Sequence, residues 1–217
     1  HLLSAGQGEA ANALLKILEE PPGNTTLMLV TDHKELLLPT ILSRCQHLGA
    51  PRLNDDFVGE WLLNNGANGD NVSLMIGLSS GNIHQARFLL EQPLAELIAL
   101  LDKLVQTVTS ENPDGWRSFT QTYAKLANQD PASFRFHFRL LSLWFRSACR
   151  LMRGMPDLLH ETELKPGMDT FVTAYPHADL FEVALSLEET ASAIAQNLYM
   201  PLILINLLLD VQKILHS

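Results

Sequence analysis

Arg44, which stands between Ser43 and Cys45, is the residue whose chemistry is most distinctive in this chain of 217 residues. Its guanidinium is permanently charged and can offset the negative charge that builds up on a phosphate during transfer. The simpler alternative is a surface arginine at a helix end, where the helix dipole favours a cation. Ser43 and Cys45 are expected to shape the turn that aims Arg44, with Cys45 a small buried residue rather than a nucleophile.

Metal and disulfide chemistry are not indicated. The two cysteines, Cys45 and Cys149, form no Cys-x-x-Cys pair, and the eight histidines show no metal-ligand spacing. We therefore expect no metal site and a reducing compartment. The formal net charge of −9 argues against a chain that grips nucleic acid unaided, because phosphate binding needs clustered positive charge.

The chain carries no pattern of a targeting or membrane segment. Its longest apolar run, residues 202–209, is interrupted by Asn206 and is too short to span a bilayer, and no signal peptide is evident near the start. We expect a cytoplasmic protein. Because the sequence opens on His1 within a motif, we also expect it to be the C-terminal portion of a longer protein.

The residues around Arg44 are predicted to form an α/β layer. Helical spacing of apolar residues over 8–20 stops at Pro21-Pro22. The β-branched and apolar run over 25–31 is typical of a strand buried on both faces. A short helix is expected over 40–44 after Pro39, followed by a second strand over 45–48.

The remainder of the chain is predicted to be helical, so the fold class is mainly α with few strands. Three short helices are expected before Pro93, and longer amphipathic helices after it. The longer helices are predicted at 94–109, from 112, 130–153, 168–175, 178–198 and 201–216. The last is apolar on nearly all sides, which places it at the centre of a bundle or against a partner.

Taken together, motifs in the first 45 residues resemble the bacterial clamp-loader family, AAA+ proteins that open the sliding clamp of the replicative DNA polymerase. These are Asn12-Ala13-Leu14-Leu15-Lys16, Leu18-Glu19-Glu20-Pro21-Pro22, Thr31, Leu38-Pro39-Thr40-Ile41 and Ser43-Arg44-Cys45. Each piece alone is weak, but the joint pattern is highly specific. Within the family, the sequence most resembles the δ′ (delta-prime) subunits of DNA polymerase III, which do not hydrolyse ATP.

The resemblance implies roles for particular residues. Arg44 would reach the ATP of a neighbouring subunit in trans. Thr31 falls at a nucleotide-sensing position, although satisfying a strand-end backbone group explains it equally well. His84 stands where ATP-hydrolysing subunits carry a lid arginine, and Arg87 lies about 300° further around a helix. The chain contains no phosphate loop or Walker B pair, so it is expected to bind no cofactor, with ATP and Mg at the neighbour.

The family pattern implies three domains and a set of partners. Residues 1–50 would be the end of an AAA+ domain, 51–92 a helical lid, and 93–217 a helical collar for oligomerisation. The expected partners are γ/τ and δ subunits in a hetero-pentamer, with primed DNA and the sliding clamp reached through the complex and no membrane contact. The expected function is to help ATP-driven clamp loading during replication, without independent catalysis.

Two other functions remain open. A γ/τ-like subunit that hydrolyses ATP, with its phosphate loop upstream, would be expected to carry an arginine at the position of His84. An unrelated helical interaction module would require Arg44 to be dispensable.

Two groups of charged residues could contact a partner or could simply be exposed to solvent. Lys16, Glu19 and Glu20 are interpreted as a solvated helix end rather than a subunit contact. An arginine stripe falls on one side of the helix predicted over 130–153, and we interpret it as the wet face of a buried helix rather than a DNA or partner contact. Its members are Arg135, Arg139, Arg146, Arg150 and Arg153.

The sheet of the family also makes a prediction about the first fifty residues. There, the phosphate-loop strand lies between the strand that ends at Thr31 and the strand after Arg44. Without it, both strands lose a neighbour and expose unpaired backbone. Residues 1–50 are therefore expected to be mobile, rearranged or paired with another chain.

Overall fold

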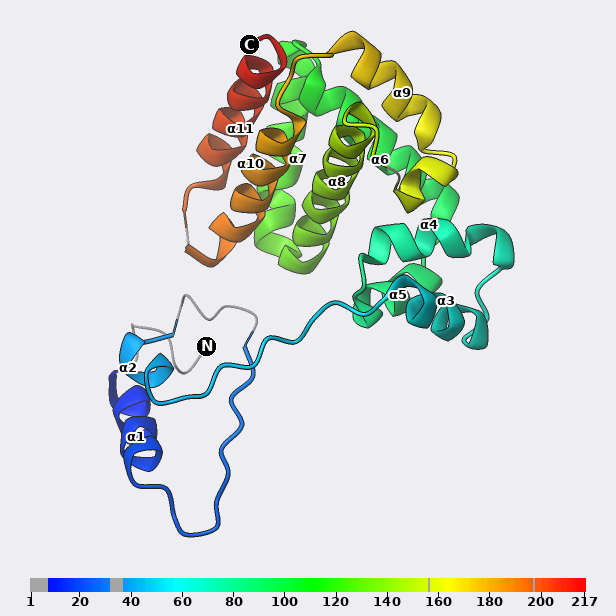
Figure 1. Ribbon diagram of the computed structural model, residues 1–217. Coiled ribbons are helices and arrows are strands. Elements are labelled where there is room, and N and C mark those ends of the chain that lie inside the picture. Colours follow the sequence, from blue (N-terminus) through cyan, green and yellow to red (C-terminus); the bar gives the residue numbers. More distant parts are fainter. Residues whose placement is uncertain (1–7, 32–36, 156, 197) are drawn as a thin grey trace. The chain divides into compact units, whose positions relative to one another are not determined.

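The computed structural model describes residues 8–31, 37–155, 157–196 and 198–217. The chain divides into two compact units, His1–Pro51 and Arg52–Ser217. Across the described ranges the structure is helical and contains no β-strand, which confirms a mainly α fold (Figure 1). None of the helices described is both long enough and apolar enough to cross a membrane.

The N-terminal unit contains two helices, α1 (Gly8–Glu19) and α2 (Pro39–Leu42). Helix α1 ends where the sequence predicts. The Glu20 amide makes the last hydrogen bond, to the Lys16 carbonyl at 3.0 Å, and the two prolines that follow have no amide hydrogen with which to continue the helix. The chain then turns at Asn24, which has a positive φ of 61°. Helix α2 is anchored by Ile41, whose side chain is fully buried.

The two strands predicted over 25–31 and 45–48 are wrong for the described structure. Both segments lie outside any strand, and the side chains of Met28, Val30 and Leu48 are 85%, 88% and 86% exposed. An apolar run becomes a buried strand only when neighbouring strands pair with its backbone and other layers cover its faces. In the described part of this unit, α1 and α2 supply neither a ladder nor a second layer for these residues.

The C-terminal unit begins with three short helices, α3 (Asp55–Asn64), α4 (Gly69–Ser79) and α5 (Ile83–Leu90). Asparagine side chains cap each of them: Asn54 accepts from the Phe57 amide at 2.9 Å, and Asn82 accepts from the His84 amide at 2.9 Å. Helix α4 is capped likewise by Asn68. These caps satisfy amides that have no partner within the helix, so local sequence fixes where each helix starts.

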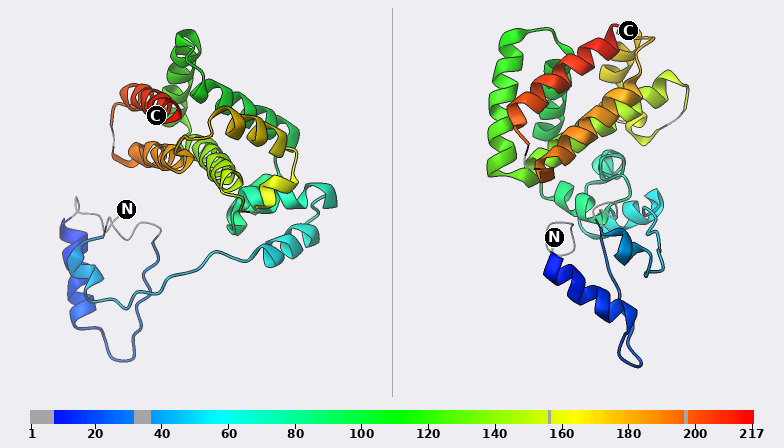
Figure 2. Two further views of the ribbon diagram at one scale, coloured as in Figure 1. Left: turned by 45° about the horizontal axis from the view of Figure 1, so that its top comes forward. Right: turned by 90° about the vertical axis from the view of Figure 1, so that its left-hand side faces the viewer.

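Five longer helices then pack side by side as a bundle (Figures 1 and 2). They are α6 (Leu94–Thr109), α7 (Pro113–Gln129), α8 (Pro131–Met152), α10 (Leu180–Ala193) and α11 (Met200–Leu215). Helix α9 (Lys165–Ala174) and the 3₁₀ turn η2 (Leu158–Glu161) pack against α8, and the 3₁₀ turn η3 (Ile194–Gln196) follows α10. Helix α8 is the hub, because α6, α7, α9 and α10 all contact it.

Aromatic side chains of α8 form much of the bundle core. The rings of Phe134 and Phe138 stack with centroids 4.3 Å apart, and Trp144 meets Phe171 of α9 edge to face at 5.3 Å. Such pairs add about 0.5–1.5 kcal/mol each beyond the apolar area that they bury. The helix predicted over 130–153 therefore supplies Phe134, Phe138 and Trp144 to the core of the bundle.

Helix α11 lies against α6, α7 and α10 and keeps one side uncovered in the described structure. Leu204, Leu208 and Val211 are fully buried, whereas Leu202 and Leu209 are 54% and 52% exposed. Of the two positions expected for this apolar helix, the centre of the bundle is therefore wrong.

Candidate functional site

The candidate site is built on the short helix α2 and the turn that ends it. Pro39 opens the helix with a backbone already restricted to helical φ, and the Ser43 amide donates to the Pro39 carbonyl at 2.9 Å. The next two amides bond three residues back: Arg44 to Ile41 at 3.1 Å and Cys45 to Leu42 at 3.3 Å. This tightened turn, together with the buried Ile41, fixes the position of the Arg44 backbone.

Arg44 lies against the end of α1. Its Nη2 donates to Glu19 Oε1 at 2.6 Å, and its Nη1 donates to the Thr40 carbonyl at 3.0 Å. Ser43 helps to shape the site, because its hydroxyl donates to the same Thr40 carbonyl at 3.1 Å and accepts from Nη1 at 3.4 Å. The guanidinium is thus oriented by three partners while the Arg44 side chain remains 37% exposed.

The ion pair between Arg44 and Glu19 joins α1 to α2 across the described part of this unit. The Glu19 side chain is 51% exposed, so water screens the pair, and exposed pairs contribute about 0–1 kcal/mol. A phosphate oxygen could replace the Glu19 carboxylate at little energetic cost, since both are anionic acceptors that suit a guanidinium. The sequence interpretation of Glu19 as a purely solvated residue is therefore incomplete.

The other predicted site residues divide between the two units. Cys45 is a free thiol of intermediate exposure, so the expectation of a buried residue is only partly met. Thr31 is exposed and belongs to no strand, which removes the strand-end position that was predicted for it. His84 lies exposed in the first turn of α5, and Arg87, in its last turn, is 4.0 Å from Glu91.

The arginine stripe is largely used for contacts inside the C-terminal unit. Arg139 donates to the Ser79 carbonyl at the end of α4 at 3.2 Å, and Arg150 lies 3.5 Å from Asp157. Arg146 makes a bidentate pair with Glu188, with Nε and Nη2 at 3.0 and 2.8 Å from the two carboxylate oxygens. These three arginines bind residues of the segments packed against α8, so the interpretation of the stripe as a purely solvent-exposed face is incomplete. Arg135 and Arg153 are exposed, as that interpretation predicts.

The pKa values of charged residues on α8 and α10 reflect these contacts. Burial alone would raise the pKa of Glu188, but hydrogen bonds from Arg146 and Ser142 and the positive charge of Arg146 lower it below its usual range. Burial lowers the pKa of Arg139, and the neighbouring charge of Arg52 lowers it further. The lowered pKa keeps Glu188 ionised at neutral pH, as its pair with Arg146 requires.

A tyrosine and a histidine form a second polar pair within the bundle. Tyr123 Oη and His137 Nδ1 lie 3.1 Å apart. Burial raises the pKa of Tyr123 to about 12. Burial also lowers the pKa of His137, and the negative charge of Asp130 offsets part of that decrease. This pair is a structural contact between α7 and α8. Across the residues that the structure describes, no group of three or more His, Cys, Asp and Glu side chains could hold a metal ion.

Comparison with known proteins locates a relationship in the segment that contains Arg44. The family model described as DNA polymerase III, delta subunit, matches residues 6–54. The proteins named DNA polymerase III subunit delta' from Pseudomonas aeruginosa and Haemophilus influenzae are each 51% identical over 53 residues. The resemblance to delta-prime subunits is confirmed for this stretch. It includes Glu19, Thr31 and the Ser43-Arg44-Cys45 motif.

The extent of the match is small relative to both sequences. The aligned stretch covers 24% of this chain and 16% of each of those two relatives. The delta' subunit of Escherichia coli is 58% identical over 43 residues, which are 19% of this chain and 13% of that protein. The similarity therefore concerns the N-terminal unit.

Proposed function

We propose that this protein is a non-catalytic δ′ subunit of a DNA polymerase III clamp loader. In that role it helps the ATP-driven loading of a sliding clamp onto primed DNA, and Arg44 serves the ATP site of a neighbouring subunit. The observation that carries the proposal is the family match over residues 6–54, which contains Arg44 within its full motif.

The partners and cofactors follow from the same proposal. The chain works in the cytoplasm within a hetero-pentamer that contains γ/τ and δ subunits, and it reaches primed DNA and the clamp through that complex. ATP and Mg belong to the neighbouring subunit, and this chain binds neither. In the family pattern, His84 stands in place of the lid arginine of the ATP-hydrolysing subunits.

The local geometry supports a role for Arg44 in trans. Arg44 lies in the turn that ends a short helix with a buried anchor, and its side chain is 37% exposed. In the proposed cycle, the γ-phosphate of the neighbour's ATP displaces Glu19 from Nη2, and the Arg44 charge offsets the negative charge that develops on the transferring phosphoryl group. The Thr40 carbonyl, already bonded to Nη1, keeps the side chain oriented during this exchange.

The test is the DNA-stimulated ATPase of the reconstituted loader with Arg44→Ala. We expect turnover at the served site to fall by at least about tenfold, since arginine fingers contribute roughly 10³-fold or more in related phosphoryl transfers. Arg44→Lys should also lose turnover, because a single ammonium cannot stay bonded to the Thr40 carbonyl and reach the phosphate with a second nitrogen, as the guanidinium does.

The matched control is Arg87→Ala, which removes an exposed arginine of α5 that lies 4.0 Å from Glu91, one turn away. It should leave turnover unchanged. Turnover that is equally unaffected by Arg44→Ala would overturn the proposed role of Arg44 and would favour a helical interaction module.

A further inference from the structure

Helix α10 carries three acidic residues and no basic residue, whereas α11 carries Asp210 and, in its last turn, Lys213. Residues 178–212 contain five acidic residues and no Lys, Arg or His. The five are Asp179, Glu182, Glu188, Glu189 and Asp210. Only Glu188 pairs with a cation among the contacts described above, through Arg146 of α8.

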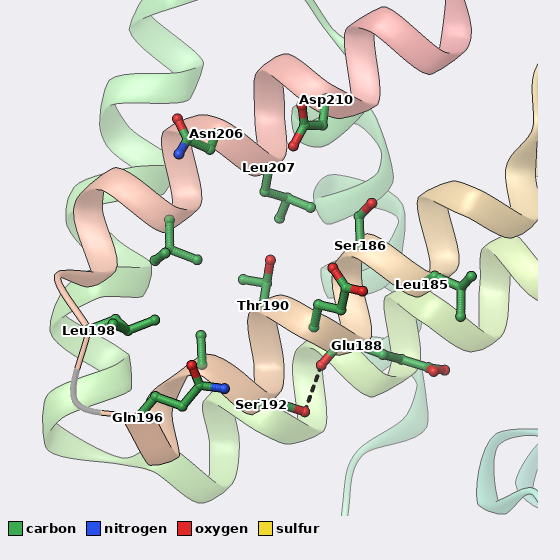
Figure 3. A pocket seen from close by; sticks show the side chains of 13 residues that line it. Leu185, Ser186, Glu188, Thr190, Ser192, Gln196, Leu198, Asn206, Leu207 and Asp210 are labelled. Atoms are coloured by element: carbon green, nitrogen blue, oxygen red, sulfur yellow. Dashed lines mark hydrogen bonds between the residues drawn. The ribbon is translucent and has the colours of Figure 1, made fainter.

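A cleft of about 560 Å³ lies between the same two helices. Its apolar lining comes from Leu185, Ala193, Leu198, Ile203 and Leu207. Its acidic residues are Glu188, which is paired with Arg146, and Glu189 and Asp210. Figure 3 shows Asn206, Leu207 and Asp210 of α11 across the cleft from Ser186 and Thr190 of α10. The cleft thus combines an apolar lining with carboxylates and has no basic residue among those that line it.

An exposed apolar stripe lies on α11, each of its residues one position before a residue that lines the cleft. Leu202, Ile205 and Leu209 are 54%, 43% and 52% exposed, and their spacing of three and four residues places them on one face of the helix. Leu185 and Leu198, which line the cleft, are themselves 40% and 46% exposed. Continuous exposed apolar surface with polar groups at its rim is typical of a surface that binds a partner.

We infer that the α10–α11 cleft is a docking site for one cationic amphipathic helix of a partner protein. Its apolar face enters the cleft and covers Leu202 and Leu209, while its Lys or Arg side chains meet Glu189 and Asp210. A helix laid along a groove meets it through positions spaced by three and four residues, which matches the exposed stripe of α11.

Charge decides against the other occupants. A second copy of this chain that docked through the same cleft would bring a lining with Glu188, Glu189, Asp210 and no basic residue against the same carboxylates. Nucleic acid would be repelled for the same reason. The inference does not depend on the proposed role of Arg44, because docking in this cleft needs neither ATP nor a neighbouring ATPase.

The test measures binding of two labelled synthetic peptides to the full chain by fluorescence anisotropy. Each is about 18 residues long, which as a helix roughly matches the length of α11. One has Leu at the a and d positions of a heptad and Lys elsewhere, and the other keeps the Leu pattern with Glu in place of Lys. We expect the Leu/Lys peptide to bind and the Leu/Glu peptide to fail.

Two charge-reversed variants locate the site. In Glu189→Lys/Asp210→Lys, the affinity for the Leu/Lys peptide should fall by at least about tenfold, because two attractions become repulsions. The control, Glu163→Lys/Asp169→Lys, makes the same change in net charge at exposed positions outside the cleft and should bind as the unmodified protein does.

A separate measurement on the unmodified protein keeps the inference testable even where a variant folds poorly. Binding of the Leu/Lys peptide should slow amide hydrogen exchange in α10 and α11. Equal losses in both variants, or exchange that slows only elsewhere, would overturn the inference. Sedimentation that shows a dimer lost only in Glu189→Lys/Asp210→Lys would assign the surface to a second copy and would also overturn it.

Discussion

The close packing of α4 on η2 predicts an unusual response to Gly77→Ala. A Cβ atom built on Gly77 would lie 2.9 Å from Leu159 Cγ and in still closer conflict with Leu159 Cδ2. Leu159 is only 2% exposed, so its side chain has little room to move away. The absence of a side chain at Gly77 therefore allows this helix and this turn to approach each other.

The size of the effect follows from two opposing contributions. In an open helix, Gly→Ala stabilises by about 1 kcal/mol, because alanine loses less backbone freedom on folding. Overpacking of a filled interior costs about 1–3 kcal/mol. We expect the overlap with Leu159 to prevail, so that Gly77→Ala lowers the free energy of unfolding by about 1–2 kcal/mol and Tm by about 2–8 °C.

The assay is urea unfolding of Gly77→Ala beside Gly167→Ala, a matched substitution in helix α9. A Cβ atom on Gly167 would have no neighbour within 4 Å, so this variant should be about 0.5–1 kcal/mol more stable than the unmodified protein. A gain for Gly77→Ala equal to that for Gly167→Ala would refute the packing argument.

A double-mutant cycle with Leu159→Ala identifies the atoms responsible. Leu159→Ala alone should cost about 2–4 kcal/mol, because it empties a buried position. In that background the Gly77→Ala substitution should lose its cost and become neutral or stabilising, since the overlapping atoms are gone. A cost for Gly77→Ala that persists without the Leu159 side chain would place the strain elsewhere.

Two further predictions concern charge. Glu19→Gln removes the negative charge 2.6 Å from Arg44 Nη2 but keeps the shape of the side chain. If Glu19 binds Arg44 only when no phosphate is present, the DNA-stimulated ATPase of the reconstituted loader should not fall. A fall as large as with Arg44→Ala would contradict this. Burial lowers the pKa of His137, so the imidazole binds a proton more tightly in the unfolded chain than in the folded one. The free energy of unfolding should therefore be unaffected by His137 above about pH 6.5, and it should decrease as the pH falls from there toward the folded pKa. Urea midpoints at pH 7.5 and pH 5.0 should therefore separate less in His137→Gln, which keeps an acceptor for Tyr123, and an equal separation would count against this account.

Most of the C-terminal unit could be predicted from the sequence because local interactions determine its helices. The motifs Asn112-Pro113 and Asp130-Pro131 predicted helix starts, and α7 and α8 begin at those prolines with the preceding side chains as caps. The apolar period over residues 94–109 gave the bounds of α6. Each of these signals lies within a few residues of the feature that it predicts.

The strands and the ion pair of Arg44 could not be predicted in the same way. A strand needs backbone partners that are distant in sequence, and residues 25–31 look the same in sequence whether or not such partners are present. Glu19 lies 25 positions from Arg44, beside other charged residues such as Lys16 and Glu20. No spacing rule connects two helices that are joined by a long segment, so only the structure selects the partner of Arg44.

The exposure of that ion pair bears directly on the proposed role of Arg44. An exposed pair contributes at most about 1 kcal/mol, so Glu19 would reduce the fraction of Arg44 available to a phosphate by no more than about fivefold. A fully buried pair would cost about 3–5 kcal/mol to break and would make the arginine unavailable by a factor of hundreds or more. With 37% of its side chain exposed and its helix anchored by Ile41, Arg44 is both oriented and releasable. A residue that must act on a nucleotide held by another chain needs both properties, and the sequence motif alone supplies neither.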